Sequence, residues 1–232
     1  MSGILRRCCG CDAAVEFNIA TLAENNNHVM YALEDSSCPN RFFCGSCRSF
    51  EISLTDGAVA GGQLVAKYSR PLRCSASPAK CCCYQEMETF DASGSSAGKT
   101  IETCYCCVPQ FNVIRPDGTI EYKLSQPTCC GDMLVNCCAE GICNCRIPFY
   151  IFPADASTSS KPAGKIVKIW SGLVKEAFTD ADNFELEFPS DAQNDSKARL
   201  IGALFLLNQL YFEKSQAAHR WEDGGYTEIH SD

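Results

Sequence analysis

Nineteen cysteines are the most prominent reactive side chains in this sequence of 232 residues. Several are adjacent in the chain, most plainly in the run Cys81, Cys82 and Cys83. Adjacent cysteines rarely bridge each other, because disulfide geometry requires separated and facing Cα atoms. The N-terminal segment also lacks the apolar core of a signal peptide, so we expect a reducing cytosol. Free cysteines there serve as acylation sites, metal ligands or small apolar residues.

Two cysteine pairs have the spacing of zinc ligands. Cys44 and Cys47 are separated by two residues, and so are Cys104 and Cys107, which allows a site of four thiolates. Cysteines are so frequent in this chain that the same spacing also arises without a metal. A zinc site and four metal-free cysteines therefore both stay open as interpretations.

Groups for bond-making catalysis are not apparent in the sequence. The three histidines, His28, His219 and His230, lie in turn-like or polar contexts, and none forms a recognisable nucleophile and base arrangement. We therefore expect no enzyme activity. The net charge of −8 also argues against a nucleic-acid partner, because duplex binding usually requires a basic stripe.

Alternation of apolar and polar residues predicts an all-β domain built as a meander. Phe50, Ile52 and Leu54 show the pattern, and Phe111 and Val113 repeat it before the turn 116–118. Two stretches of the chain also match in order, because Phe111 and Gly118 repeat the spacing of Phe50 and Gly57. We interpret this match as a duplicated four-strand unit.

A meander brings alternate loops to the same end of the sheet. This rule predicts that the cysteine clusters share one end, with Gly57, Ser95 and Gly118 at the other. The clusters are Cys38, Cys44, Cys47, Cys74, Cys81–Cys83, Cys104–Cys107 and the group between Cys129 and Cys145.

The segment Ala198–Phe212 departs from this alternation. It is apolar on almost all sides and follows the polar residues 194–196, which suit a helix start. A spanning helix needs about 20 apolar residues, and this segment is shorter and contains Asn208 and Gln209. We therefore expect a helix, at about residues 196–213, enclosed by the strands.

Three motifs resemble the phospholipid scramblase family. They are residues 69–74 (SRPLRC), 165–184 (KIVKIWSGLVKEAFTDADNF) and 200–206 (LIGALFL). The similarity runs from about Asn27 to Glu213. It predicts a scramblase-type domain over residues 27–214, preceded by a cysteine-containing lead-in at 1–26 and followed by a polar tail at 215–232.

The resemblance implies a tubby-like fold, which is a closed antiparallel β-barrel around one central C-terminal helix. It also implies calcium-responsive, ATP-independent phospholipid scrambling or lipid binding at the cytosolic face of the plasma membrane. The alternative is an acyl-anchored signalling adapter with nuclear entry and no direct lipid transport. A phospholipid membrane is then the main partner, and signalling proteins are further candidates.

The resemblance also assigns lipidation and nuclear-import sites. The run Cys81, Cys82 and Cys83 stands where scramblases carry palmitoylated cysteines, and two or more acyl chains give stable membrane anchoring. Inert loop cysteines are the alternative. Lys165, Lys168 and Lys175 match a stretch that acts as a nuclear-import signal in relatives, although three such lysines are also typical of a solvated face.

A calcium site is implied at residues 180–191. Asp180 and Asp182 fit the first and third positions of an EF-hand-like loop, and Asp191 fits the twelfth. Glu185 replaces the glycine that such a loop requires, and Pro189 opposes a helical exit. We therefore expect low calcium affinity, and the alternative is a strand entered through an aspartate-rich turn.

Overall fold

The computed structural model describes residues 15–20, 28–37, 47–57, 59, 61–73, 83–104, 108–127, 146–169 and 183–212. These residues form one antiparallel sheet, in which eleven strands lie in the order of the chain, and one C-terminal helical segment. The strands are β1 (Glu16–Ala20), β2 (His28–Asp35), β3 (Phe50–Asp56), β4 (Leu64–Arg70), β5 (Glu86–Asp91), β6 (Ser96–Glu102), β7 (Gln110–Ile114), β8 (Ile120–Ser125), β9 (Arg146–Pro153), β10 (Gly164–Ile169) and β11 (Asn183–Glu187). The helical segment consists of α4 (Asn194–Leu207) and the π-helical turn η5 (Asn208–Phe212).

The predicted meander is confirmed in the described strands. Phe50, Ile52 and Leu54 are buried at alternate positions of β3, as the sequence pattern predicts. The turn between β7 and β8 is closed by a hydrogen bond from the Gly118 amide to the Arg115 carbonyl. Gly118 has a φ of 85°, a backbone conformation that glycine adopts without steric cost.

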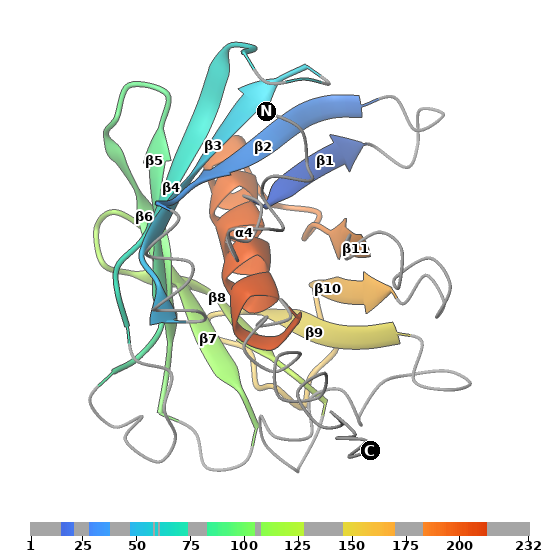
Figure 1. Ribbon diagram of the computed structural model, residues 1–232. Coiled ribbons are helices and arrows are strands. Elements are labelled where there is room, and N and C mark those ends of the chain that lie inside the picture. The colour runs from blue at the N-terminus through green and yellow to red at the C-terminus, as the bar shows by residue number, and fades with distance from the viewer. Residues whose placement is uncertain are drawn as a thin grey trace, which may run out of the picture.

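The sheet curves around the helix (Figure 1). Its two edge strands both pack on the helical segment through aromatic rings. Phe17 of β1 lies 4.6 Å from Phe205, and Phe184 of β11 lies 5.6 Å from Phe212, measured between ring centroids. Among the described strands, β1 and β11 are the two ends of the hydrogen-bonded order. The closed barrel that we expected is therefore not confirmed, and the two edges are connected by side-chain packing on the helix.

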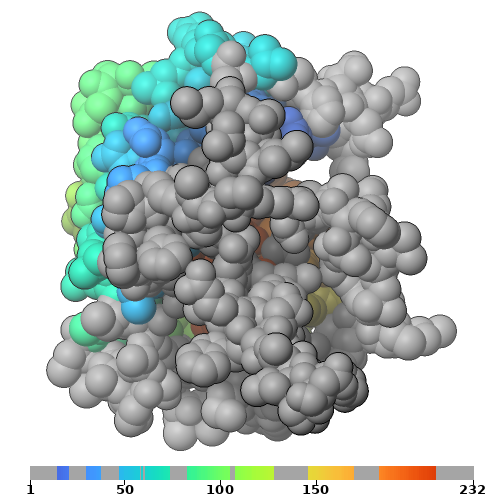
Figure 2. Space-filling model, viewed as in Figure 1, coloured from blue at the N-terminus to red at the C-terminus, as the bar shows by residue number. Residues whose placement is uncertain are grey.

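Burial of the helix is confirmed. Leu200, Leu206 and Leu207 are all buried in the core. Figure 2 shows small orange-red patches of the helical segment near the centre of the view. Gly202 allows close contact with the sheet, because a Cβ atom there would lie 3.0 Å from both Tyr68 and Thr89. An all-round apolar helix is stable in water only when it is enclosed in this way.

The helix runs from one end of the curved sheet to the other. Near its start, Arg199 donates a hydrogen bond to the Ala97 carbonyl beside the β5–β6 turn. Near its end, Tyr211 packs on Phe111 at the first residues of β7. We call the end with the β3–β4, β5–β6 and β7–β8 turns the hairpin end, and the opposite end the cysteine end.

The proposed duplication corresponds to β3–β6 and β7–β10. Phe50 and Phe111 are both buried at the start of their units. Gly57 and Gly118 both have positive φ angles, of 98° and 85°. These similarities agree with a repeated unit, whereas duplication itself stays a prediction.

Candidate functional site

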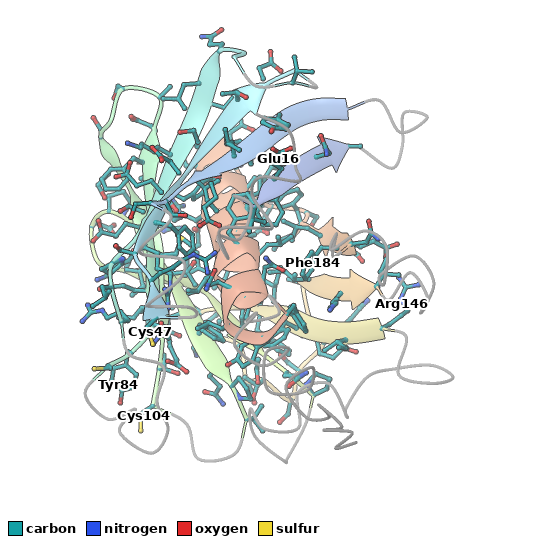
Figure 3. All side chains as sticks on the ribbon, viewed as in Figure 1. Glu16, Cys47, Tyr84, Cys104, Arg146 and Phe184 are labelled. Atoms are coloured by element: carbon teal, nitrogen blue, oxygen red, sulfur yellow. The ribbon has the colours of Figure 1, made fainter. Side chains whose placement is uncertain are left out.

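Three cysteines of the described residues lie at the same end of the sheet. Cys47 precedes β3, Cys83 precedes β5 and Cys104 follows β6, and all three are free thiols. Figure 3 shows Cys47 and Cys104 close to the lower ends of these strands. The predicted cysteine end is therefore confirmed for these three residues. The other cysteines of the prediction lie outside the described residues.

A set of buried polar side chains lies at the same end, inside the curved sheet. Each of its members continues the buried alternation of its strand by one more position, where a polar residue replaces an apolar one. Arg70, for example, follows the buried residues Ala66 and Tyr68 of β4. We call these residues the polar collar: Glu34, Arg48, Arg70, Gln85, Glu102 and Gln126.

Hydrogen bonds connect the first half of the collar from β2, through the residues that precede β3, to β4. The guanidinium of Arg48 donates to both carboxylate oxygens of Glu34, at 3.0 and 2.9 Å. Arg70 then donates to the backbone carbonyl of Arg48. Burying two arginines and one carboxylate would be costly without such hydrogen bonds, which pair the Glu34 carboxylate with Arg48 and satisfy part of the Arg70 guanidinium.

The second half of the collar connects it to a described cysteine. Arg70 donates to the Gln85 side-chain oxygen at 2.5 Å, and the Gln85 amide donates to Glu102 at 3.1 Å. The Gln85 side-chain nitrogen in turn donates to the Cys83 carbonyl at 3.3 Å. The backbone that carries Cys83 is thus held by the buried network.

The end of the helical segment reaches the same region. Asn208 and Gln209 are only 5% and 3% exposed, and both belong to η5. Lys168, at the last inward position of β10, places its ammonium 4.9 Å from the centroid of the Phe212 ring. Turns of π-helix occur frequently at functional sites. The cysteine end therefore combines free thiols, a buried charge network and a polar helix terminus.

The hairpin end holds the other terminus of the helix. Arg199 donates to Glu121 of β8 through Nε at 3.0 Å and Nη2 at 2.6 Å, and Ser196 donates to the same carboxylate at 2.7 Å. Burial alone would raise the pKa of Glu121. The hydrogen bonds from Ser196 and Arg199, together with the Arg199 charge, outweigh that effect and lower this pKa. This ion pair fixes the start of α4 to the sheet.

Comparison with known proteins assigns the family. A family model described as Scramblase matches residues 12–214. The chain belongs to the scramblase family. It is 36% identical to phospholipid scramblase 1 of Homo sapiens over 191 residues, which are 81% of this chain and 54% of that protein. It is 34% identical to phospholipid scramblase 2 of Bos taurus, over 81% of this chain and 58% of that protein. Phospholipid scramblase family member 5 of Homo sapiens is 33% identical, with coverage of 82% and 64%.

These scramblase relatives are longer than the region that they share with this chain. The chain spans between half and two thirds of their length. No solved structure matches the chain. Among its described residues, no helix is both long enough and apolar enough to cross a membrane.

The structure describes only part of each site expected for a scramblase. Of the lipidation run, Cys83 lies at the cysteine end, whereas Cys81 and Cys82 lie outside the described residues. Lys165 and Lys168 occupy opposite faces of β10. Lys165 faces outward and pairs with Glu187 at 3.4 Å, whereas Lys168 turns inward to Phe212. Lys175 lies outside the described residues.

The calcium segment contains a strand in its middle. Residues 183–187 form β11, paired along its length with β10, as the alternative interpretation predicted. Asp191 lies beyond β11 at the hairpin end and forms a hydrogen bond with Tyr122, whose pKa burial and the nearby carboxylates raise to about 12. An extended strand cannot wrap around one ion, so the described part does not fit an EF-hand loop. Asp180 and Asp182 lie outside the described residues, and a weak site there stays a prediction.

The two cysteine pairs proposed for zinc are described only through Cys47 and Cys104. No cluster of three or more metal-binding side chains occurs within the described parts of the chain. The zinc interpretation therefore stays untested.

The polar collar was not predicted from the sequence, although the sequence contains a pattern for it. The matching triplets at residues 69–71 (SRP) and 125–127 (SQP) end two strands, and both place a polar residue in phase with the buried positions. Arg70 and Gln126 are these residues. A polar residue in phase with a buried face usually indicates the end of a strand, and here it marks a buried polar layer at one end of the sheet interior.

Proposed function

We propose that this protein binds phospholipids at a membrane surface and moves them between leaflets, without ATP and without making or breaking bonds. Membership of the scramblase family supports this proposal. The observation that carries it is the cysteine end, where free thiols lie beside the buried polar collar. Such an end can lie against lipid headgroups while the sheet stays in water.

Acylation of Cys81, Cys82 and Cys83 provides the membrane anchor in this proposal. Each buried CH₂ of an acyl chain contributes about 0.8 kcal/mol, and two chains are needed for stable anchoring. The gain exceeds the repulsion between an acidic protein, of net charge −8, and an acidic leaflet. Cys83 at the cysteine end supports an orientation with that end toward the cytosolic face of the plasma membrane.

Calcium acts in this proposal as a weak activator at Asp180 and Asp182. The strand between these residues and Asp191 supports a site of few ligands, and few ligands give low affinity. The proposed fold is a scramblase-type barrel that includes β1 (Glu16–Ala20), so it begins within the lead-in predicted at 1–26, runs to about residue 214 and leaves the tail 215–232 outside it.

A second function is favoured by one observation. Most apolar side chains of the helical segment are buried against the curved sheet, so they do not face lipid. An acyl-anchored adapter that binds signalling proteins, and enters the nucleus when it is not acylated, needs no lipid path. Lys165 lies partly exposed on the outer face of β10, beside Glu187, where such a partner could contact it.

A liposome assay separates the two functions. Purified protein is reconstituted into vesicles with a fluorescent lipid in both leaflets, and the fraction that an external reductant bleaches is measured. Scrambling raises this fraction above one half. The fraction is measured with and without millimolar calcium, and this comparison tests whether calcium activates the protein. A fraction of one half at all calcium concentrations, from protein that is bound to the vesicles, contradicts lipid transport and favours the adapter.

A further inference from the structure

One large apolar side chain is exposed at the cysteine end. Leu72 follows β4 and is 56% exposed. The other exposed large apolar side chains among the described residues, Val59, Val65 and Ile120, lie toward the hairpin end. Single apolar side chains on a protein surface are common and need no function of their own. The surroundings of Leu72 therefore decide whether its exposure has a role.

The residue after Leu72 lies between two of the free cysteines. The amide of Arg73 donates a hydrogen bond to the Cys47 carbonyl at 3.1 Å. The hydrogen bond with Glu86 raises the pKa of Arg73, and Cys83 is near enough to add to this rise. Leu72 therefore adjoins the lipidation run in space, although Leu72 and Cys83 are 11 positions apart in the sequence.

The backbone that carries Leu72 is fixed to the sheet. Pro71 precedes it, and the proline ring restricts the backbone there. The Arg73 side chain pairs with Glu86 of β5, and the second oxygen of Glu86 accepts a hydrogen bond from Lys99 of β6 at 3.1 Å. Because its neighbours are held in this way, Leu72 is presented to its surroundings from a defined position.

The side chains around Leu72 match the composition of a membrane interface. Tyr84 directly follows Cys83 and is partly buried, and Figure 3 shows it near Cys47 and Cys104 at the same end. Tyrosine has an apolar ring and a polar tip, which suits the boundary between lipid headgroups and acyl chains. Free cysteines behave as small apolar side chains. A lipid surface therefore fits this end of the sheet.

We propose that Leu72 inserts into the acyl region of a lipid bilayer beside the acylated Cys83 and forms a second anchor that belongs to the protein itself. Acyl chains on flexible side chains hold a protein at a membrane without fixing its orientation. A leucine that is fixed to the sheet limits the tilt of the cysteine end. This inference rests on the proposed function, with Cys81–Cys83 acylated, and names the residue of that surface that enters the lipid.

The first experiment compares the two ends of the sheet. The full acylated chain is bound to phosphatidylcholine vesicles, and the fluorescence of Leu72→Trp and Val59→Trp is recorded with and without brominated acyl chains in the lipid. Val59 is the matched control, because it is 72% exposed at the hairpin end. The signal of the natural tryptophans, Trp170 and Trp221, is subtracted with the unmodified chain. Quenching is expected for Leu72→Trp and not for Val59→Trp.

The second experiment measures how firmly the chain is held. The rate at which the acylated chain transfers from donor to acceptor phosphatidylcholine vesicles is compared at equal acyl content, which mass spectrometry confirms. Leu72→Asp should raise this rate by roughly tenfold, because burial of a leucine side chain contributes at least that factor. Val59→Asp should change it less than twofold, and Leu72→Met should restore slow transfer.

Two results overturn the proposal. One is the absence of bromine quenching in Leu72→Trp, and the other is an equal transfer rate for Leu72→Asp and the unmodified chain. Quenching of Val59→Trp alone would show that the hairpin end faces the membrane, which also refutes the anchor. The liposome assay on the unmodified protein is independent of these outcomes. Lipid transport without insertion of Leu72 would refute only the anchor, whereas insertion without transport would refute the proposed transport and leave the anchor in place.

Discussion

Removal of the buried cation that holds the start of the helix should destabilise the whole fold. Arg199 and Glu121 have side chains only 5% and 7% exposed. Arg199→Met leaves the Glu121 carboxylate buried without its main partner. Breaking a buried pair from one side costs roughly 3–5 kcal/mol. For a domain of this size, such a loss lowers the melting temperature by on the order of 10 °C.

The same carboxylate provides a matched control. Arg115 also pairs with Glu121, at 3.2 Å, but its side chain is 51% exposed. Arg115→Met should therefore cost less than about 1 kcal/mol, as exposed ion pairs do. The free energy of unfolding is measured by urea denaturation for both variants and for the double variant Glu121→Leu, Arg199→Met. The double variant should recover part of the loss, because it leaves no unpaired charge in the interior.

Acidity should weaken the same contact. The pKa of Glu121 is lower in the folded protein than its ordinary value of 4.5. The contribution of the ionised Glu121 carboxylate to the free energy of unfolding is therefore complete above pH 4.5 and is lost as the pH falls through the folded pKa. Glu121→Gln should reduce this part of the acid sensitivity. Equal costs for Arg199→Met and Arg115→Met, or an Arg199→Met variant that unfolds with unchanged free energy, would refute the role assigned to the pair.

Three further predictions follow from the core, the calcium segment and the cysteines. Phe205→Ala should lower the free energy of unfolding by roughly 3–5 kcal/mol by opening a cavity, and Leu204→Ala should lower it less because Leu204 is only partly buried. Equal losses in urea denaturation would contradict this packing. Calcium titration should give an affinity on the order of 10⁻⁴–10⁻³ M, and a submicromolar value abolished by Asp180→Ala would show that the site is stronger than its ligands imply. Joint replacement of Cys81, Cys82 and Cys83 by serine should move the protein from the membrane fraction to the cytosol or nucleus, whereas Cys104→Ser should not. Retention of the triple variant in the membrane fraction would exclude this run as the anchor.

Much of the fold could be predicted because its strands follow simple local rules. Alternation in β3, β7 and β8 and the turn at Gly118 are properties of a few neighbouring residues, and the structure confirms them. The enclosed helix was also predictable, since an apolar surface on all sides has no other stable place in water. The calcium segment was harder, because the same residues 183–187 fit either a loop or a strand until their pairing with β10 is known.

Composition and spacing by themselves determined the meander, the enclosed helix and the shared end of Cys47, Cys83 and Cys104, because each depends on local periodicity and on the alternation of chain direction. Tertiary structure alone decided which polar residues meet inside the sheet. Arg70 and Gln85 are 15 residues apart and Arg199 and Glu121 are 78 apart, and no local pattern pairs them. It also decided that Lys165 and Lys168 face opposite sides of one strand. Burial and charge compensation act between residues that only the folded chain brings together.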